Sequence, residues 1–496
     1  MVANATAMSI FVAFVLVTLG ITIWASGRAR TTAQFYAAEG SIKPWQNGLA
    51  IAGDYLSAAS FLGTISVFFS LGVDGLLYAV GAAAGWPIAT CLIAERLRTL
   101  GKYTLADVLC VRLNARPVRA MTALTAFAIC GGYLVSQIVG AGTLVQILFD
   151  IPYATAVILV GVLMTLYVMF GGMVATTWIQ IVKATILIAT ALFMVVLLLG
   201  RFDHSFGTLV DAAASTRADP ESFLRPGGLL SSPFDAVGLA LAFALGPAGM
   251  PHVLMRFFTV RDAQSARRSL VFATIVIALF QMLVIFLGTG AAALVTGDTG
   301  SLDAQGGLIG GANMAAIHLA RLLGGMPLFG VVAAVTFATI LAVVSGLTLA
   351  AASALSHDLY RHVFRPAGAD DRSEIRVSRI ATVAIGCLTV GAGLLFRHQN
   401  IGFLATLPLV LAASSNFPIL LLALYWRRLT TAGAVCGGLT GLALSLSFVA
   451  LSPKVWVGVF GHEKPVFPFE YPTVISLGFA LLVAWLVSVN ARARAA

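Results

Sequence analysis

The chain has 496 residues, of which 59% are hydrophobic and only 10% are charged. Soluble domains carry about 25% charged residues, and no soluble core could bury this much apolar surface, so a soluble enzyme or binding protein is excluded. The formal net charge of +10 does not indicate a nucleic-acid partner, because the basic residues lie between apolar stretches, where they report membrane topology. We expect an all-α polytopic membrane protein.

Thirteen apolar stretches have about the 20 residues that a helix needs to cross a bilayer. In chain order they lie near 8–26, 45–70, 75–94, 120–149, 153–170, 177–200, 234–255, 270–293, 324–350, 378–396, 401–425, 431–452 and 472–490. Most of the 30 Lys and Arg residues fall in every second connection, and such an excess marks the cytoplasmic side. We expect a plasma or inner membrane protein with the N-terminus outside and the C-terminus in the cytoplasm.

Two of these stretches contain residues that interrupt a helix. Gly53 and Asp54 lie within 45–70, and Gly246-Pro247-Ala248-Gly249 lies within 234–255. Proline and glycine break a regular transmembrane helix, although they also occur as simple kinks in packed helices. The two stretches are five spans apart and run in opposite directions, which is typical of transporters built from inverted repeats.

We therefore expect one transmembrane domain over residues 1–496. It has four parts, which are an extra helix at 8–26, a first repeat at 45–200, an inverted second repeat at 234–425 and two C-terminal helices at 431–490.

Asp54 is an acidic residue in the middle of a membrane-length stretch. Placing a charge there costs about 2.5–3.5 kcal/mol on insertion scales, so such a residue normally faces a partner or a cavity and has a function. We expect Asp54 to bind a coupling cation or to take up a proton. The alternative is that it only caps amide groups freed by the helix break.

Other polar residues near the breaks have two interpretations each. Ser57 and Ser60 are ligands for a solute, or they bond back to their own helix. Lys183 is a buried positive charge, or it extends to the membrane surface. Asn416 lies in an apolar helix, where it contacts a solute or joins neighbouring helices.

Several runs of the sequence resemble the sodium:solute symporter family. They are GDYLSAASFLG at 53–63, FGGMVATTWIQIVKA at 170–184, GPAGMPHVLMRFF at 246–258 and SHDLYRHVF at 356–364. The runs NGLAIAGDYLSAASFLG and ASSNFPILLLALYW are most similar to the acetate permease branch. The resemblance implies a LeuT-type fold of about 13 transmembrane helices, with five-plus-five inverted repeats and one preceding and two following helices.

The resemblance also implies two sites at mid-membrane. The cation site combines Gly53, Asp54, Leu56, Thr339, Ala342 and Val343. The solute site combines Ser57, Ser60, Phe61, Gly246, Gly249 and Asn416.

The chain departs from the family pattern at the cation site. Relatives carry hydroxyl residues where Ala342 and Val343 stand, an acid where Gln180 stands and a glutamine where Lys183 stands. Hard cations need oxygen ligands, so Na⁺ binding is weakened here unless Asp54 or Thr339 supplies the missing oxygens. A lysine beside the site mimics the charge of the ion, which makes Lys183 and Gln180 candidates for coupling and leaves H⁺ beside Na⁺ as a possible coupling ion.

We expect a secondary symporter that couples a Na⁺ or H⁺ gradient to the uptake of a small monocarboxylate such as acetate. The expected partners are this solute, a monovalent cation and the lipid bilayer, with no enzymatic activity and no cofactor beyond the coupling ion. The alternatives are a symporter for an amino acid or a urea-like solute, and an uncoupled channel or sensor.

Overall fold

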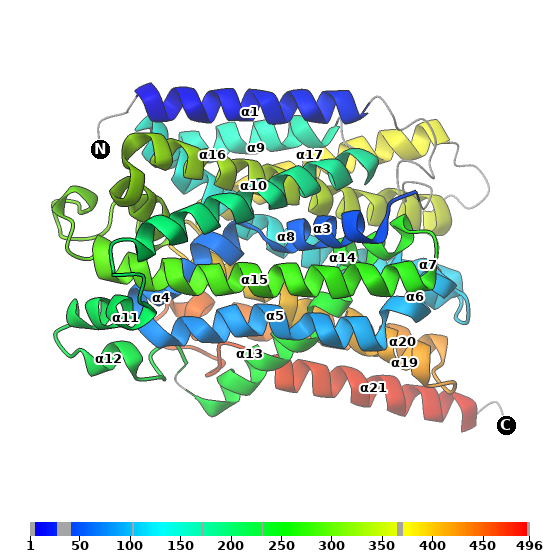
Figure 1. Cartoon of the computed structure of the whole chain (residues 1–496). Coiled ribbons are helices and arrows are strands. Elements are labelled where there is room, and N and C mark those ends of the chain that lie inside the picture. Colours follow the sequence, from blue (N-terminus) through cyan, green and yellow to red (C-terminus); the bar gives the residue numbers. More distant parts are fainter. Residues whose placement is uncertain are drawn as a thin grey trace.

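The computed structural model describes residues 5–26, 41–101, 104–169, 173–230, 232–364 and 371–493. Within these ranges the chain is helical, apart from connecting segments and one isolated β-bridge between Leu302 and Leu308. Residues 170–172 of the 170–184 motif lie outside the described residues. Figure 1 shows the long helices side by side in one bundle, with α1 along one edge and α21 along the opposite edge.

Helices occupy all thirteen predicted ranges. They are α1 (Ala5–Ser26), α3 (Pro44–Tyr55) with η2 (Ala59–Gly63) and α4 (Thr64–Leu71), α5 (Gly75–Leu92), α8 (Ala115–Phe149), α9 (Tyr153–Met169), α10 (Met173–Leu199), α13 (Pro233–Leu245) with η4 (Pro247–Gly249) and α14 (Pro251–Met255), α15 (Ala263–Val295), α16 (Ala315–Ser353), α17 (Asp371–Leu395), α18 (Ile401–Ser414) with α19 (Asn416–Tyr425), α20 (Thr431–Ala450) and α21 (Thr473–Ala493). The prediction of an all-α polytopic membrane protein is confirmed.

Shorter helices connect these elements. They include α6 (Ala94–Leu100), α7 (Leu105–Cys110), α11 (Phe206–Ser215), α12 (Glu221–Leu224), η5 (Arg256–Thr259) and η8 (Ala354–Phe364). α1 begins at one end of the bundle and α21 ends at the other (Figure 1). An odd number of crossings requires this placement.

Within the described ranges, nine helical segments are long and apolar enough to cross a membrane, and α1, α9 and α13 contribute shorter apolar stretches. Burial separates a central helix from peripheral ones. In the most apolar window of α16, 94% of the residues are buried inside the protein, against 22% for α21. α16 therefore forms the centre of the bundle, whereas α21 presents most of its surface to lipid.

α16 begins at Ala315, upstream of the predicted start near 324. Its first turns carry His318 and Arg321, which an apolar window leaves out. Both residues have local partners, since His318 Nε2 lies 2.9 Å from the Ile309 carbonyl oxygen and Arg321 pairs with Asp298. The predicted start instead coincides with a kink, where Gly324 is non-helical and Gly325 has φ +66°.

Both predicted helix breaks are present. α3 ends at Tyr55 and the chain resumes as a π-helical turn at Ala59, whereas α13 ends at Leu245 and α14 starts at Pro251. Proline at 247 and 251 lacks the N–H that a continuous helix would use. The interrupted backbone is buried in protein, which is the condition under which irregular backbone is tolerated at membrane depth.

Candidate functional site

The serines of the first break satisfy part of its backbone. The Ser57 amide donates to Ser60 Oγ over 3.3 Å, and Ser60 Oγ donates to the Tyr55 carbonyl over 2.7 Å. The Ala59 amide donates to Ser57 Oγ, which is also 2.9 Å from the Tyr133 hydroxyl oxygen. Back-bonding to a preceding carbonyl, the alternative role considered for these serines, is therefore present at Ser60, whereas Ser57 bonds to the Ala59 amide and to Tyr133.

Asp54 forms a buried ion pair with Arg256. Arg256 Nε lies 2.6 Å from Asp54 Oδ2, and Nη2 lies 3.3 Å from Oδ1. Both side chains are 2% exposed. This two-point contact joins the end of α3 to the segment that follows α14, so it links the two broken helices directly. Burying either charge alone would be expensive, and pairing offsets that cost.

Gln180 on α10 connects Asp54 to the central helix. Its Nε2 donates to Asp54 Oδ1 over 2.6 Å and to the Ala342 carbonyl over 2.9 Å. Thr177, one turn earlier, accepts a hydrogen bond from Arg256 Nη1 over 2.6 Å. Thr177, Gln180 and Lys183 are spaced three apart, which places them on one face of the helix. α10 thus presents a polar stripe to the ion pair.

Lys183 completes this stripe. The side chain is 5% exposed, and its ammonium group donates to the carbonyl oxygen of Gly53. The prediction that Lys183 extends to the membrane surface is therefore wrong. Gly53 permits this packing, because a Cβ at residue 53 would lie 2.7 Å from the Gln180 carbonyl oxygen.

Three of the six predicted cation residues, Gly53, Asp54 and Ala342, therefore meet between α3, α10 and α16, and their oxygens face protein donors. The Gly53 carbonyl accepts from Lys183, and the Ala342 carbonyl accepts from Gln180. Leu56 caps the end of α3, and Val343 is a buried apolar side chain. Thr339 Oγ1 is buried and has no hydrogen-bond partner in the described part of the chain.

A small cavity lies beside this region, between the two breaks. It has a volume of about 30 Å³. Its lining comes from α3, η2, α4, α5, α8, α13, the second break, α15 and α18, namely Tyr55, Ala59, Ser60, Thr64, Tyr78, Ala82, Tyr133, Phe243, Met250, Gln281, Gly402, Ala405, Thr406 and Leu409. None of these residues is charged. The space accommodates a solute of only a few non-hydrogen atoms.

Among the six residues predicted to bind solute, Ser60 lines this cavity. Gly246 and Gly249 lie against the backbone of α18, since a Cβ at either position would come within 3 Å of Leu409 or Ala412 backbone atoms. Asn416 donates to the Gly249 carbonyl over 2.9 Å. The structure places these three residues in the packing of the second break.

The other two predicted solute residues also lie next to the cavity and outside its lining. Ser57 bonds to Tyr133, as described above, and Phe61 is a buried ring 6.3 Å from the ring of Phe280. Asn416 additionally accepts from Thr125 Oγ1 over 2.6 Å, which ties α19 to α8.

Sequence reasoning missed Arg256 and Gln281. Arg256 directly follows the predicted stretch 234–255, so its charge is interpreted as part of a connection. Its place in the 246–258 motif, five residues after Pro251, is the feature of the sequence that indicates a role at the second helix break. Gln281 is an isolated amide in the apolar run of α15. A single glutamine there is ordinarily read as a contact between helices, and its place at the cavity follows only from the packing.

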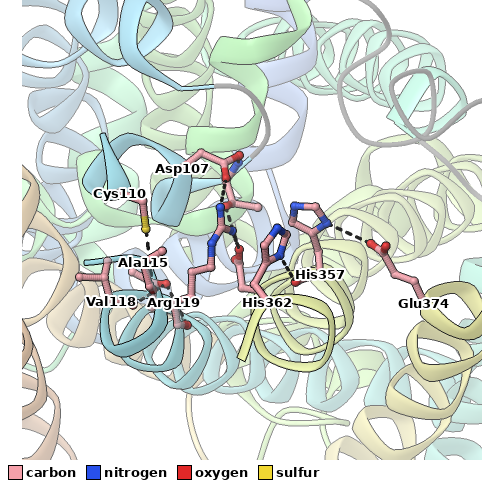
Figure 2. A network of polar contacts seen from close by, with 11 residues as sticks. Asp107, Cys110, Ala115, Val118, Arg119, His357, His362 and Glu374 are labelled. Atoms are coloured by element: carbon pink, nitrogen blue, oxygen red, sulfur yellow. Dashed lines mark hydrogen bonds and ion pairs between the residues drawn. The ribbon is translucent and has the colours of Figure 1, made fainter. Parts of the chain in front are cut away.

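A second polar cluster lies at the end of the bundle where α8 begins (Figure 2). Arg119 pairs with Asp107 over 2.7 Å and with Asp358, while Glu374 contacts His357 over 3.0 Å and Arg361 over 2.5 Å. Asp107, His357 and Asp358 lie close enough together to hold a metal ion, but Arg119 already pairs with both carboxylates. The cluster ties α7, α8, η8 and α17 together at this end.

Comparisons with known proteins agree with this architecture. A profile of the sodium:solute symporter family matches residues 35–441. Among solved structures, the chain is similar to a Na⁺-coupled sialic acid symporter in a substrate-bound outward-open state, with 15% identity, 98% of each chain covered and a TM-score of 0.77.

Two further structures share the fold. One is a nucleobase-cation-symport-1 family transporter in a closed conformation, with 16% identity, 93% and 95% of the two chains covered and a TM-score of 0.58. The other is a manganese transporter of Eremococcus coleocola, with 16% identity, 92% and 94% covered and a TM-score of 0.52. The protein belongs to the sodium:solute symporter family and has the LeuT-type fold predicted from its sequence.

Proposed function

We propose that this symporter couples a cation gradient to the uptake of a small monocarboxylate such as acetate by alternating access. One observation carries the proposal. A small cavity with an uncharged lining lies between the two broken helices, next to a buried cluster of Asp54, Arg256 and Lys183. Discontinuous helices at mid-membrane are where transporters of this architecture bind solute and ion.

The size and lining of the cavity support a small solute. Acetate has four non-hydrogen atoms, and its methyl group fits the apolar side formed by Ala59, Phe243 and Leu409. Hydroxyl groups of Ser60 and Thr64 face the same space. The similarity of two long sequence runs to the acetate permease branch points to the same solute class. An amino acid would bring an ammonium group, for which the lining has no carboxylate.

The coupling ion is the second part of the proposal. The ammonium group of Lys183 lies on the Gly53 carbonyl, where the family pattern would place a cation ligand. This contact places the Lys183 side chain between α3 and α10 in place of a bound ion. The missing side-chain oxygens at Ala342 and Val343 also disfavour Na⁺, which needs oxygen ligands. We infer that H⁺ drives uptake, with Na⁺ as the alternative that the experiment tests.

The charges of the cluster also indicate what holds the site closed. Arg256 bonds to α3 through Asp54 and to α10 through Thr177, so a single side chain bridges both repeats. Opening one side of the site requires this bridge to rearrange as α3 and α14 move relative to α10. The ion pair is therefore a coupling element between the two broken helices as well as a structural contact.

Uptake by purified protein in proteoliposomes tests the proposal. Labelled acetate is offered with an inward H⁺ gradient, an inward Na⁺ gradient or neither. Accumulation under the H⁺ gradient that exceeds the accumulation in protein-free liposomes supports H⁺-driven symport, and accumulation under Na⁺ alone assigns the ion to Na⁺. Equilibration without accumulation in every condition indicates an uncoupled channel and overturns the proposal.

The orientation of the chain is tested separately. The distribution of basic residues supports an N-terminus outside and a C-terminus in the cytoplasm of the plasma or inner membrane. Single cysteines placed at Gln305 and at Arg261, which are both exposed, in a variant without native cysteines should be labelled by an impermeant maleimide from outside and from inside, respectively. Labelling in the reverse pattern would invert the topology.

A further inference from the structure

Gln281 presents unpaired hydrogen-bonding atoms at the central cavity. The residue belongs to α15, lines the cavity and is 3% exposed. Neither its Oε1 nor its Nε2 has a hydrogen-bond partner within the described ranges. Buried polar side chains are nearly always hydrogen-bonded, so an unpaired amide at the wall of a cavity indicates a ligand that pairs with it.

Several other polar groups of the lining already have hydrogen-bond partners in the protein. Ser60 Oγ donates to the Tyr55 carbonyl, and Thr406 Oγ1 donates to the Phe403 carbonyl over 2.7 Å. The Tyr78 hydroxyl oxygen lies 3.0 Å from that of Tyr471. Gln281 is thus the amide of the cavity that has both a donor and an acceptor to offer.

We propose that Gln281 recognises the polar head of the solute through a pair of hydrogen bonds, an inference that rests on the proposed function. Nε2 donates to a carbonyl oxygen of the solute, and Oε1 accepts from an O–H or N–H group on the same carbon. A carboxylic acid in its neutral form and a primary amide both carry this arrangement. An ionised carboxylate has acceptors only, and it would leave Oε1 facing another acceptor.

The absence of charge in the lining points the same way. An anion taken from water into this cavity needs a cation within contact distance, and none of the lining residues is basic. Arg256 is engaged by Asp54, and Lys183 by Gly53. A neutral acid meets no such penalty. The solute then enters together with its own proton.

In this arrangement the solute itself carries the coupled proton, so the ratio of protons to solute molecules is one to one. One carboxylate and one proton combine on the outside, cross as the neutral acid and separate inside, so no net charge moves. Uptake should follow the pH gradient and should not respond to a membrane potential imposed with potassium and valinomycin. A potential-driven increase in uptake would contradict transport of the neutral acid.

Competition with wild-type protein tests the hydrogen-bond pair without any substitution. Acetic acid, acetamide and acetone have the same number of non-hydrogen atoms, but only the first two offer a donor beside the carbonyl group. We expect acetamide to inhibit labelled acetate uptake and acetone to leave it unchanged. Inhibition by both compounds, or by neither at large excess, would overturn the proposal.

Variants test the residue itself. Gln281→Met keeps the length of the side chain and removes both polar atoms, so the KM for acetate should rise at least about tenfold, as expected for the loss of neutral hydrogen bonds. Met282→Leu is the matched control, because Met282 is the next residue on α15 and is 55% exposed on the outer surface. An unchanged KM in folded Gln281→Met protein would overturn the assignment.

The two proposals fail in different ways. Wild-type protein that accumulates neither acetate nor a small amide contradicts the proposed function. Wild-type protein that accumulates acetate normally, while acetamide has no effect and Gln281→Met keeps its KM, contradicts only the role of Gln281.

Discussion

Arg256 contacts Asp54 through two nitrogen atoms, and this ion pair joins the two broken helices in the buried centre of the protein. Two residues 202 positions apart in the chain thus compensate each other's charge at membrane depth. Gln180 and Thr177 hold the pair against α10. The cluster therefore connects the end of α3, the segment that follows α14 and α10.

Asp54→Asn should abolish concentrative acetate uptake. The substitution leaves the guanidinium of Arg256 buried without its counter-charge, and breaking one side of a buried pair costs about 3–5 kcal/mol. We expect membrane insertion to persist with a lowered unfolding midpoint in detergent. Proteoliposome uptake and thermal unfolding measure the two effects.

The double variant Asp54→Asn with Arg256→Gln separates stability from function. Removing both charges should restore much of the thermal stability, whereas uptake should remain lost if the pair couples the two helices. Full uptake by the double variant, or by Asp54→Asn alone, would reduce Asp54 to a structural cap.

Gly53→Ala should impair folding and transport together. A Cβ at residue 53 would lie 2.7 Å from the Gln180 carbonyl oxygen, so α3 and α10 would have to separate. Overpacking of this kind costs about 1–3 kcal/mol, and it would also pull Lys183 away from the Gly53 carbonyl. Gly131→Ala is the control, because a Cβ there meets nothing within 4 Å. Equal unfolding midpoints for the two variants would refute the close packing of α3 and α10.

Lys183→Gln should change the ion dependence of uptake. Removing the ammonium group frees the Gly53 carbonyl and restores the residue that relatives carry, so a Na⁺ requirement should emerge. Uptake at fixed pH over a series of Na⁺ concentrations measures the change. Lys454→Gln serves as the control for the loss of a positive charge, because the Lys454 side chain is half-exposed and lies outside the central cluster. Identical ion dependence in Lys183→Gln and the wild type would mean that the contact with Gly53 plays no part in coupling.

Glu470→Gln should stabilise the protein at neutral pH. Burial raises the pKa of the Glu470 carboxyl, with Asp235 adding to the rise and Lys454, 3.6 Å away, opposing it. Because the pKa is higher in the folded state, the folded protein binds more protons, and stability falls as pH rises from the ordinary range of a glutamate through the raised value.

The pH profile of unfolding checks this sign. The amide is neutral at every pH, so the unfolding midpoint of Glu470→Gln should exceed that of the wild type at neutral pH, and the difference should shrink toward acidic pH. A wild-type midpoint that is higher at neutral pH would show that the charged carboxylate stabilises the fold.

Much of the fold is predictable from the sequence because lipid imposes simple rules. Every crossing needs a long apolar run, and breaks need glycine or proline, as at Gly53 and Pro247. The start of α16 was harder to predict from the sequence, because His318 and Arg321 interrupt the apolar window. Both residues have local polar partners in the structure. The true boundary of the helix depends on contacts with residues 298 and 309.

The site was predictable only in part, since long-range pairing has no local signature. Asp54 and Lys183 stand out as charges in apolar runs, and both lie in the central cluster. Arg256, by contrast, directly follows an apolar stretch, where basic residues ordinarily report membrane topology. Gln281 has the sequence context of a polar residue that joins two helices. Their roles depend on which helices pack together. The same is true of the hydrogen bond that Asn416 donates to the Gly249 carbonyl.

The most direct test of this account is acetate uptake by the wild-type protein in Na⁺-free proteoliposomes under an inward H⁺ gradient. The account predicts accumulation above that of protein-free liposomes, which collapses when the pH gradient is dissipated and does not increase when Na⁺ is added. Accumulation that requires a Na⁺ gradient, with none under H⁺ alone, would contradict it.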